Sequence, residues 1–573
     1  MRPLLDTALA AAAASTASLD HPVPDRHGSN LYTGDTQFAL LLQQYLPAEV
    51  YAHLQPYLTH MGQLAGGRLD ELALTADKNP PTLEYRSRSG QDAQRIVKHP
   101  AYVEMERVAY GDFSLAIMSH REGVLGWQGK LPPLAKYALT YLFVQAEFGL
   151  CCPLSMTDSL SRTLRKYGAP ELVDKYWGQL TAVDFEDQAQ GAMFMTEQAA
   201  GSDIANTQTM ATPQADGSWR LTGEKWFCSN PDAAFAMVLA RVEGAPAGMK
   251  GISLFLLPRQ LDDGSHNHYR IVRLKEKLGT RSMASGEIRM EGAVAYLVGE
   301  QGRGFVQMAD MVNNSRLSNG VRAAGLMRRA VAEAEFIASE RHAFGKALQD
   351  MPLMQRQLDK LRIRAEQART MVLQTAAALQ RSDAGEEGGY ALLRILTPLI
   401  KFRACRDARM VTGDAMEVRG GCGYIEEWSD PRLVRDAHLG SIWEGTSNIV
   451  ALDVLRAIRR EGSLPVLQAH AAQLLAEIND TEAAPAFKAV LQDALERAGR
   501  FAQSAVEAGP EGERLARTAA SSLYHSFTAI AMAWEASQMR SAERMRWAQL
   551  VLVHRVLPRD PLQDSEIPAG WLA

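Results

Sequence analysis

The chain has 573 residues and a formal net charge of -5; 46% of its residues are hydrophobic and 22% are charged. This composition is typical of a globular protein with a large core, and the length suggests about three or four domains. The slightly acidic balance excludes a chain that binds nucleic acid through its overall charge, so any such site must be a local cationic patch.

The N-terminal sequence and the cysteines indicate the cellular compartment of the protein. Arg2, two leucines and an alanine run loosely resemble a signal peptide, but Asp6 interrupts the apolar part, so a tail is predicted instead. No stretch of about 18 uncharged apolar residues occurs, so no membrane span is expected. The five cysteines form no CxxC pair, which favours reduced thiols in the cytoplasm, and no metal site is predicted.

In chain order, the sequence predicts a helical, a β, a helical and a second helical domain. Residues 1–190 combine the tail with a mainly helical domain. Short strand-like runs separated by turn signals predict a compact antiparallel β domain over residues 191–304. Apolar stripes of period 3.6 predict a helical bundle over 305–460 and a further helical domain over 461–573.

A loop from Met195 to Asp203 opens the β domain. Thr196 and Ser202 offer hydroxyl groups, and Gly201 allows a ligand to approach the backbone closely. Such a loop can hold a pyrophosphate or the edge of a heteroaromatic ring. A turn without any ligand has the same composition, so both interpretations stay open at this point.

An aromatic residue with hydroxyl and thiol neighbours follows one predicted strand later, at Phe227, Cys228 and Ser229. The ring of Phe227 could cover one face of a planar cofactor, and Ser229 could donate a hydrogen bond to a ring nitrogen. The alternative is an ordinary strand with core aromatics.

Two further motifs follow predicted helices. Arg341 ends a long helix, and its planar fork of donors suits a phosphate, although helix C-termini favour cations in any case. The glycine-rich stretch that begins at Glu417 follows a helix rather than a strand. It also has Glu426 where a Rossmann fingerprint needs a glycine, so it is not a dinucleotide motif of that kind.

The last motif runs from Ser441 to Asn448. Glu444 lies between the bulky Trp443 and Gly445, and an apolar-periodic helix follows. A carboxylate at the mouth of a helix with apolar walls is a candidate general base, because such surroundings raise the proton affinity of a carboxylate. The alternative is a solvated residue at a helix N-terminus.

Together these five motifs resemble, in order and spacing, the acyl-CoA dehydrogenase family of flavoenzymes, most strongly over residues 190–460. Asn79-Pro80-Pro81, Cys152-Pro153 and the added helical block resemble its AidB-like alkylation-response branch. The resemblance implies a fold that is mainly α with a β domain: an N-terminal helical domain, an antiparallel β domain and a four-helix bundle, plus an extra C-terminal helical domain.

The resemblance also implies a role for each motif. Glu444 would remove the α-proton of an acyl-CoA thioester while the β-hydride moves to N5 of FAD. Arg316 and Asn313 would meet the acyl-CoA. The positions that match the FAD contacts of the family are Met195, Thr196, Gly201, Ser202, Phe227, Cys228, Ser229, Arg341, Phe344, Glu417, Gly420, Gly421, Ile442, Trp443, Gly445 and Asn448.

The same resemblance implies partners, and it also shows where this sequence differs from the family pattern. Arg341 and Phe344 match residues that reach the FAD of a neighbouring subunit, which implies a homotetramer built as a dimer of dimers. Electron-transfer flavoprotein is the expected electron acceptor. Phe227 stands where classical members have tryptophan, and Pro352 and Glu417 replace glutamines; these changes resemble marks of the branch rather than loss of FAD.

Two other functions compete with dehydrogenation as the main role. AidB-like proteins bind double-stranded DNA through the C-terminal block, so this chain could be a DNA-binding flavoprotein whose dehydrogenase activity is secondary or vestigial. The arginines available for such a surface are Arg456, Arg459, Arg460, Arg540, Arg544, Arg546, Arg555 and Arg559. A flavin monooxygenase on the same fold is the other alternative, but such relatives typically lack the glutamate.

Overall fold

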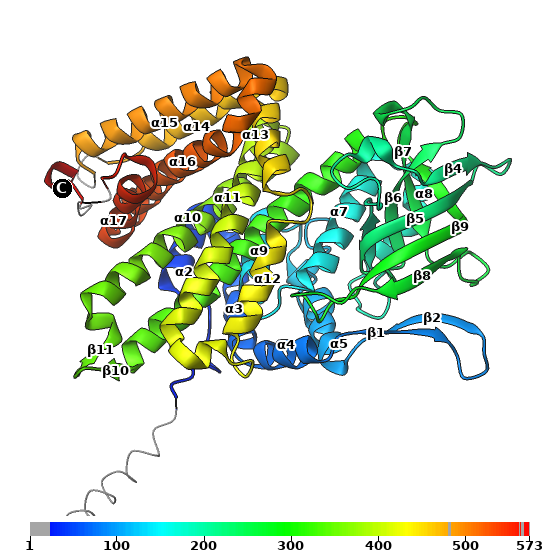
Figure 1. Cartoon of the computed structure of the whole chain (residues 1–573), viewed down its shortest axis with the longest axis horizontal. Coiled ribbons are helices and arrows are strands. Elements are labelled where there is room, and N and C mark those ends of the chain that lie inside the picture. Colours follow the sequence, from blue (N-terminus) through cyan, green and yellow to red (C-terminus); the bar gives the residue numbers. More distant parts are fainter. Residues whose placement is uncertain (1–22, 480–482, 561, 563–566, 572–573) are drawn as a thin grey trace, which may run out of the picture.

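The computed structural model describes residues 23–479, 483–560, 562 and 567–571. The chain folds into a long helical body with a β domain at one end, and the C-terminal helices lie at the other end (Figure 1). Residues 1–22, where a tail is predicted, lie outside the described residues. Among the helices that are described, none has both the length and the apolar character needed to cross a membrane.

The N-terminal part is mainly helical, as predicted. Its first described helix, α2 (Thr36–Tyr45), begins at Asp35, whose side chain accepts the backbone N–H of Phe38 at 3.1 Å. The helices that follow are α3 (Ala48–Gly66), α4 (Arg68–Lys78), α5 (Pro100–Glu106), α6 (Pro133–Phe143), α7 (Cys151–Tyr167) and α8 (Pro170–Leu180), with a π segment at Arg107–Asp112 and a 3-10 turn at Val124–Gly126.

One β-hairpin, which the sequence did not predict, interrupts these helices. Strands β1 (Thr82–Arg86) and β2 (Asp92–Val97) pair in antiparallel fashion and lie under the β domain (Figure 1). The Tyr85 hydroxyl donates to the carbonyl of Val272 at 3.1 Å, and the Gln94 side chain accepts the N–H of Ile271 at 2.8 Å. Most residues of the hairpin are exposed, so no apolar alternation marks it in the sequence.

The β domain contains one seven-stranded sheet in the order β3-β6-β4-β5-β9-β7, with β8 paired to β9. The strands are β3 (Gly191–Phe194), β4 (Met210–Pro213), β5 (Trp219–Ser229), β6 (Phe235–Val242), β7 (Ile252–Pro258), β8 (Tyr269–Leu274) and β9 (Ser285–Val298). Most pairs are antiparallel, as predicted, but β3 and β4 run parallel to β6. A further β6–β7 pairing closes the sheet on itself, and its inner residues form a core of their own.

Three long helices and two shorter ones form the bundle predicted between the β domain and the C-terminal block. They are α9 (Gly304–Glu340), α10 (Pro352–Asp383), α11 (Gly389–Arg419), α12 (Asp430–Gly440) and α13 (Ser447–Glu461). A short hairpin of β10 (His342–Ala343) and β11 (Lys346–Ala347) joins α9 to α10 with the 3-10 turn Leu348–Asp350, and the 3-10 segment Gly420–Tyr424 follows α11. The helical periodicity in the sequence is therefore confirmed in this region.

The C-terminal helices share the core of the bundle rather than forming an independent body. They are α14 (Ser463–Ala476), α15 (Pro485–Glu507), α16 (Ala516–Met539) and α17 (Ala542–Val551), with shorter turns at Gly509–Leu515, Leu552–Val556 and Ala569–Trp571. One continuous group of buried apolar side chains extends from α2 through the bundle to α17. Removal of this block would therefore expose the core of the rest.

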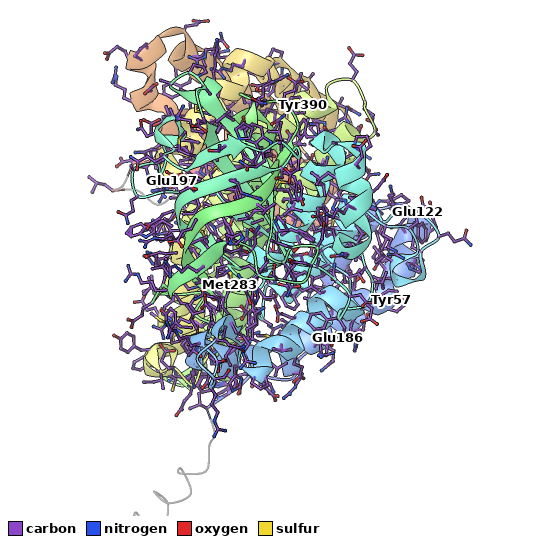
Figure 2. The ribbon with its side chains drawn as sticks, turned by 90° about the vertical axis from the view of Figure 1, so that its right-hand side faces the viewer. Tyr57, Glu122, Glu186, Glu197, Met283 and Tyr390 are labelled. Carbon is purple, nitrogen blue, oxygen red and sulfur yellow. The ribbon has the colours of Figure 1, made fainter. Side chains whose placement is uncertain are left out.

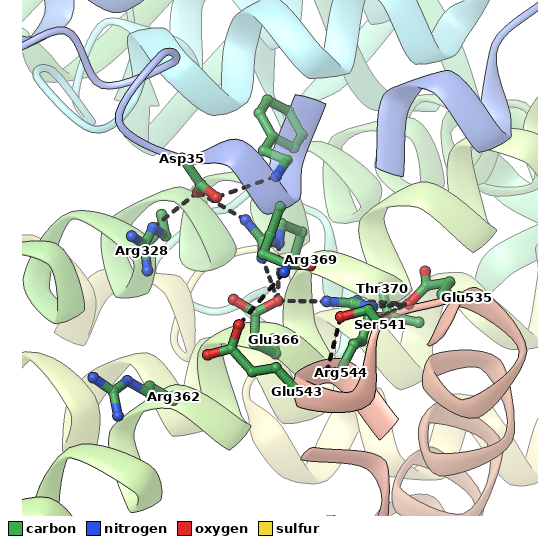
Figure 3. A network of polar contacts seen from close by, with 12 residues as sticks. Asp35, Arg328, Arg362, Glu366, Arg369, Thr370, Glu535, Ser541, Glu543 and Arg544 are labelled. Atoms are coloured by element: carbon green, nitrogen blue, oxygen red, sulfur yellow. Dashed lines mark hydrogen bonds and ion pairs between the residues drawn. The ribbon is translucent and has the colours of Figure 1, made fainter. Parts of the chain in front are cut away.

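A buried ionic network joins the N-terminal helices, the bundle and the C-terminal helices (Figure 3). The guanidinium of Arg544 in α17 donates to Glu366 of α10 and to Glu535 of α16, at 2.8 Å in each case. Arg369 of α10 pairs with Asp35 at 2.7 Å. Burial raises the pKa of Asp35, but its arginine partners outweigh burial and lower this pKa to about 2.

Candidate active site

The predicted base lies on a loop with an unusual backbone conformation. Glu444 follows α12 and precedes α13, with a φ of 54°, and Gly445 has a φ of 99°. A left-handed glutamate is strained, and it persists only where its surroundings fix it. A side chain at Gly445 would place its Cβ 3.2 Å from a terminal nitrogen of Arg316, so the glycine is needed there.

Two side chains of α9 orient the Glu444 carboxylate. The Asn319 amide donates to one oxygen at 2.8 Å, and the Ser315 hydroxyl donates to the other. Ser315 and Asn319 are four residues apart, so they lie on one face of the helix. Glu444 is half-buried and held by two neutral donors, which fixes its direction without pairing its charge.

Arg316 of α9 fixes the backbone of the Glu444 loop. Its Nε donates to the carbonyl of Glu444 at 3.0 Å, and a terminal nitrogen contacts Asp453 of α13 at 2.8 Å. Arg394 of α11 completes this buried cluster with two bonds to the same aspartate, at 2.8 and 2.9 Å. Arg316 therefore holds the base in the structure, and the predicted contact of Arg316 and Asn313 with acyl-CoA remains a prediction.

A buried lysine of α11 also fixes the backbone of the Glu444 loop. The Lys401 ammonium donates to the carbonyl of Gly440 at 2.7 Å and to that of Gly445 at 3.1 Å. These two carbonyls flank Glu444, so one side chain spans the whole loop. Burial lowers the pKa of Lys401 to about 8, although Cys405 and Glu444 partly offset the effect.

Replacing Lys401 with methionine should lower the turnover number about 10- to 100-fold, because the base would no longer be held in its productive position. The folded pKa of about 8 lies below the ordinary 10.5, so the unfolded chain binds more protons between these values. The stability of the wild type relative to Lys401→Met should therefore rise from about pH 8 to 10.5. Steady-state kinetics and thermal unfolding across this range test both expectations; equal turnover in the two proteins would contradict the first.

Aromatic and cationic side chains line the same region. The ring of Trp443 stacks on that of Phe148, with centroids 5.8 Å apart and an angle of 14°. The guanidinium of Arg322 in α9 lies 4.6 Å from the Trp443 ring centroid. Burial raises the pKa of the Cys152 thiol, and Arg322 and Ser229 lie close enough to offset part of this shift. Cys152 thus lies close to both Arg322 and Ser229.

Some of the residues predicted to meet a cofactor lie close together in the β domain. The backbone N–H of Trp226 donates to the carbonyl of Thr196 at 2.8 Å, which joins the loop after β3 to strand β5. The buried Lys225 pairs with Glu197 at 2.6 Å and fixes the base of the loop; Figure 2 labels Glu197 beside the strands. Phe227 is 64% exposed, next to this loop.

This surface fits a flat heteroaromatic cofactor. An exposed aromatic face stands beside the half-buried hydroxyl-bearing residues Thr196 and Ser229, which supply hydrogen bonds in its neighbourhood. A Cβ at Gly201 would meet nothing within 4 Å, so the loop is open toward solvent there, and Ser202 is exposed. The Cys228 side chain, in contrast, lies in the core of the β domain, so only its backbone can contact a cofactor.

A second group of predicted residues gathers elsewhere in the bundle. Arg341 donates to the carbonyl of Arg419 at 2.8 Å, which brings it beside Gly420 and the segment from Glu417 to Gly421. Phe344 is 98% exposed. This group lies near one end of α12 and Glu444 at the other; the 11 residues of α12 correspond to roughly 16 Å. The structure therefore separates the two groups within one chain.

Two residues near the base face solvent. Ile442 is 59% exposed, and Asn448 is exposed in the first turn of α13. Met195 is half-buried, and its carbonyl accepts from Lys225 at 3.3 Å. These positions are compatible with contact to a bound molecule, and their predicted roles remain predictions.

Sequence reasoning missed four side chains around Glu444: Ser315, Asn319, Arg322 and Lys401. The first three are spaced i, i+4 and i+7 in α9, so they lie on one helix face. Asn313, Asn314, Arg316 and Ser318 of the same segment are also polar, so this spacing does not stand out in the sequence. Lys401 gives no signal either, because a single lysine in a long helix is usually solvated.

The structure corrects the cationic surface expected of the C-terminal block. Arg544 is fully buried in the ionic network, so it cannot meet a phosphate backbone. Arg555 is largely buried and contacts Asp407 at 3.2 Å. Arg456 pairs with Asp453 at 2.8 Å, and Arg546 pairs with Asp359 at 2.7 Å. The remaining arginines that are exposed are Arg459, Arg460, Arg540 and Arg559.

Comparisons with known proteins cover nearly the whole chain. Residues 22–187 match the AidB N-terminal domain, residues 192–293 the acyl-CoA dehydrogenase middle domain and residues 302–459 its C-terminal domain. Putative acyl-CoA dehydrogenase AidB of Escherichia coli is 33% identical over 457 residues, which are 78% of this chain and 81% of that protein. Acyl-CoA dehydrogenase family member 11 of Caenorhabditis elegans is 29% identical over 516 residues, 87% of this chain and 82% of that protein.

A solved structure agrees with these matches. The crystal structure of Caenorhabditis elegans ACDH-11 in complex with C11-CoA superposes with a TM-score of 0.88 at 26% identity, and the superposition covers 95% of this chain and 94% of that one. The chain therefore belongs to the acyl-CoA dehydrogenase family, an oxidoreductase family whose members use FAD. Within this family, the matched N-terminal domain and the Escherichia coli relative identify it as an AidB-like member.

Proposed function

We propose that the chain catalyses the α,β-dehydrogenation of an acyl-CoA thioester, with Glu444 as the base that removes the α-proton. The observation that carries this proposal is the geometry at Glu444. Its carboxylate is oriented by Asn319 and Ser315, and its strained backbone is held by Arg316 and Lys401. Four contacts converge on one carboxylate loop, which is the preorganisation expected of a catalytic group rather than of a solvated helix end.

The chemistry assigns separate tasks to these residues. An α-proton beside a thioester carbonyl is a weak acid, so its removal needs both a positioned base and a donor for the developing oxyanion. Glu444 supplies the base, and its backbone N–H, presented by the left-handed loop, is the proposed donor. Bound FAD supplies the acceptor for the electron pair and hydrogen that leave the β-carbon. Thr196, Phe227 and Ser229 would hold the ring system.

Further partners are part of the proposal. The nematode relative was crystallised with C11-CoA, which supports an acyl-CoA as the ligand class here. The exposed Phe344 beside Arg341 supports an FAD shared between subunits of a homotetramer, because an exposed aromatic residue at a hairpin tip is available to a second copy. Electron-transfer flavoprotein as acceptor and a cytoplasmic location complete the proposal; the five free cysteines support the latter.

The direct test is the reduction of bound flavin by substrate. Purified holoprotein is mixed without oxygen with straight-chain, branched and carboxyl-bearing acyl-CoA thioesters, and the loss of oxidised-flavin absorbance is followed. The proposal expects rapid bleaching by at least one class, with formation of the 2-enoyl thioester. A protein that binds FAD and yet is bleached by none of them would refute the proposed reaction.

DNA binding, the second function considered from the sequence, now rests on fewer arginines. Because the C-terminal helices share the bundle core, point variants are a better test than truncation near Glu461. If the exposed Arg459 and Arg460 contact phosphates, replacing both with glutamate should weaken duplex binding and flatten its salt dependence by about 0.9 per lost contact. Arg497→Glu and Arg500→Glu on α15 serve as a matched control. Negligible binding by the wild type at low salt would remove this function.

A further inference from the structure

A fully buried arginine in the active-site region has no anionic partner. Arg322 of α9 has 0% exposure, and neither of its terminal nitrogens forms a hydrogen bond with any described residue. Only its Nε donates, to the carbonyl of Ser318 at 3.3 Å. A buried guanidinium without a counter-ion is strongly unfavourable, so its presence calls for a partner.

The other fully buried arginines show how this protein ordinarily treats such a charge. Each has a carboxylate at close range: Arg369 with Asp35 at 2.7 Å, Arg419 with Asp430 at 2.8 Å, Arg432 with Asp70 at 2.9 Å and Arg544 with Glu366 at 2.8 Å. Arg322 is the exception among the largest buried side chains of the described chain.

The position of Arg322 places this unpaired charge beside the proposed reaction site. Arg322 lies one turn beyond Asn319 on the helix face that orients Glu444. Its guanidinium contacts the Trp443 ring and lies close to Cys152, which in turn lies close to Ser229 of the β domain. Arg322 is therefore located beside the base loop, on the face of α9 that also carries Ser315 and Asn319.

The groups around Arg322 offer it further hydrogen-bond donors, but no carboxylate that is free to pair with it. The indole N–H of Trp443 is buried and also lacks a partner. Glu444 is engaged by Ser315 and Asn319, and the buried Glu147 accepts from Ser282 at 2.8 Å and from the backbone of Leu150 at 3.1 Å. The cation Lys401 lies close enough to interact with both Arg316 and Arg322. The region thus has unpaired donors and an excess of positive charge.

We propose that the substrate supplies the missing partner: its acyl group carries a second carboxylate, which binds Arg322 with the Trp443 N–H as an additional donor. This proposal rests on the proposed function and specifies its substrate class as the CoA thioester of a dicarboxylic acid. The planar fork of a guanidinium matches the two oxygens of a carboxylate, and the pair is strong where water is excluded. An acyl chain that ends in a methyl group leaves the buried charge unpaired, so the site discriminates against it.

The test compares thioesters of equal chain length. Glutaryl-CoA is set against pentanoyl-CoA, and adipoyl-CoA against hexanoyl-CoA, with kcat/KM measured for the wild-type holoenzyme. The expected ratio in favour of the dicarboxylic member is about 100-fold or more for at least one pair. Arg322→Met should remove this preference, and Arg322→Lys should restore part of it. Trp443→Phe, which keeps the aromatic wall and deletes the N–H, should reduce it less.

The outcomes separate this inference from the proposed function. A wild type that oxidises the methyl-ended members as well as the dicarboxylic ones disproves the inference and leaves the dehydrogenase proposal standing. An Arg322→Met variant that keeps the wild-type ratio, or that changes only FAD affinity or flavin potential, assigns Arg322 to another role and overturns it. Oxidation of no thioester at all defeats both. The kcat/KM ratios of the wild type are measured without any variant. They test the inference even if Arg322→Met folds poorly.

Discussion

Glu444→Gln is expected to lower the rate of flavin reduction by acyl-CoA by at least about 10²- to 10⁴-fold, the usual contribution of a general base. Glutamine is nearly isosteric and can still contact Ser315 and Asn319, so the loop and the bound FAD should be retained. Stopped-flow reduction without oxygen measures the chemical step, and the FAD content of the purified variant verifies the fold.

Two further proteins make this result specific. Glu386→Gln changes an exposed glutamate that pairs with Arg381 at the surface, and it should leave the rate unchanged. Asn319→Ala keeps the base but removes one of its two orienting donors, so an intermediate loss is expected. A Glu444→Gln enzyme as fast as the wild type would show that the base is another residue.

Arg544→Met should destabilise the protein by about 3–5 kcal/mol, the cost of breaking a buried ion pair while its partners remain. The variant removes a cation from the buried carboxylates of Glu366 and Glu535, and it loses the polar contacts by which Arg544 joins α17 to α10 and α16 (Figure 3). Chemical unfolding followed by circular dichroism and by tryptophan fluorescence measures the change in midpoint and reveals whether the C-terminal helices unfold first.

Arg546 provides the matched control for this experiment. It lies two residues further along α17, is exposed and pairs with Asp359 at 2.7 Å at the surface. Arg546→Met should therefore cost less than about 1 kcal/mol. Equal losses of stability in the two variants would mean that the buried network contributes no more than a surface pair.

Short sequence motifs predicted some parts of the candidate site and of the fold, but not others. Glu444, Trp443 and Gly445 could be proposed from the sequence because the motif is contiguous and the glycine follows the predicted base directly. The loop of Thr196 and the strand of Phe227 were found as separate motifs, and the structure joins them through the Trp226 to Thr196 hydrogen bond. The hairpin Thr82–Val97 was missed, because its strands depend on contacts with β8 rather than on their own apolar pattern.

The sequence by itself determined most of the helical and strand-rich regions and their order, since periods of 3.6 and 2 are local properties of the chain. It also determined the family resemblance, which rests on short contiguous motifs. The tertiary structure alone decided which charges are paired. Ser315 lies 129 residues before the carboxylate it orients, and Arg544 lies 178 residues after Glu366. An arginine in a helix looks the same in sequence whether a carboxylate meets it, as for Arg544, or none does, as for Arg322, because pairing depends on side chains that only folding brings together.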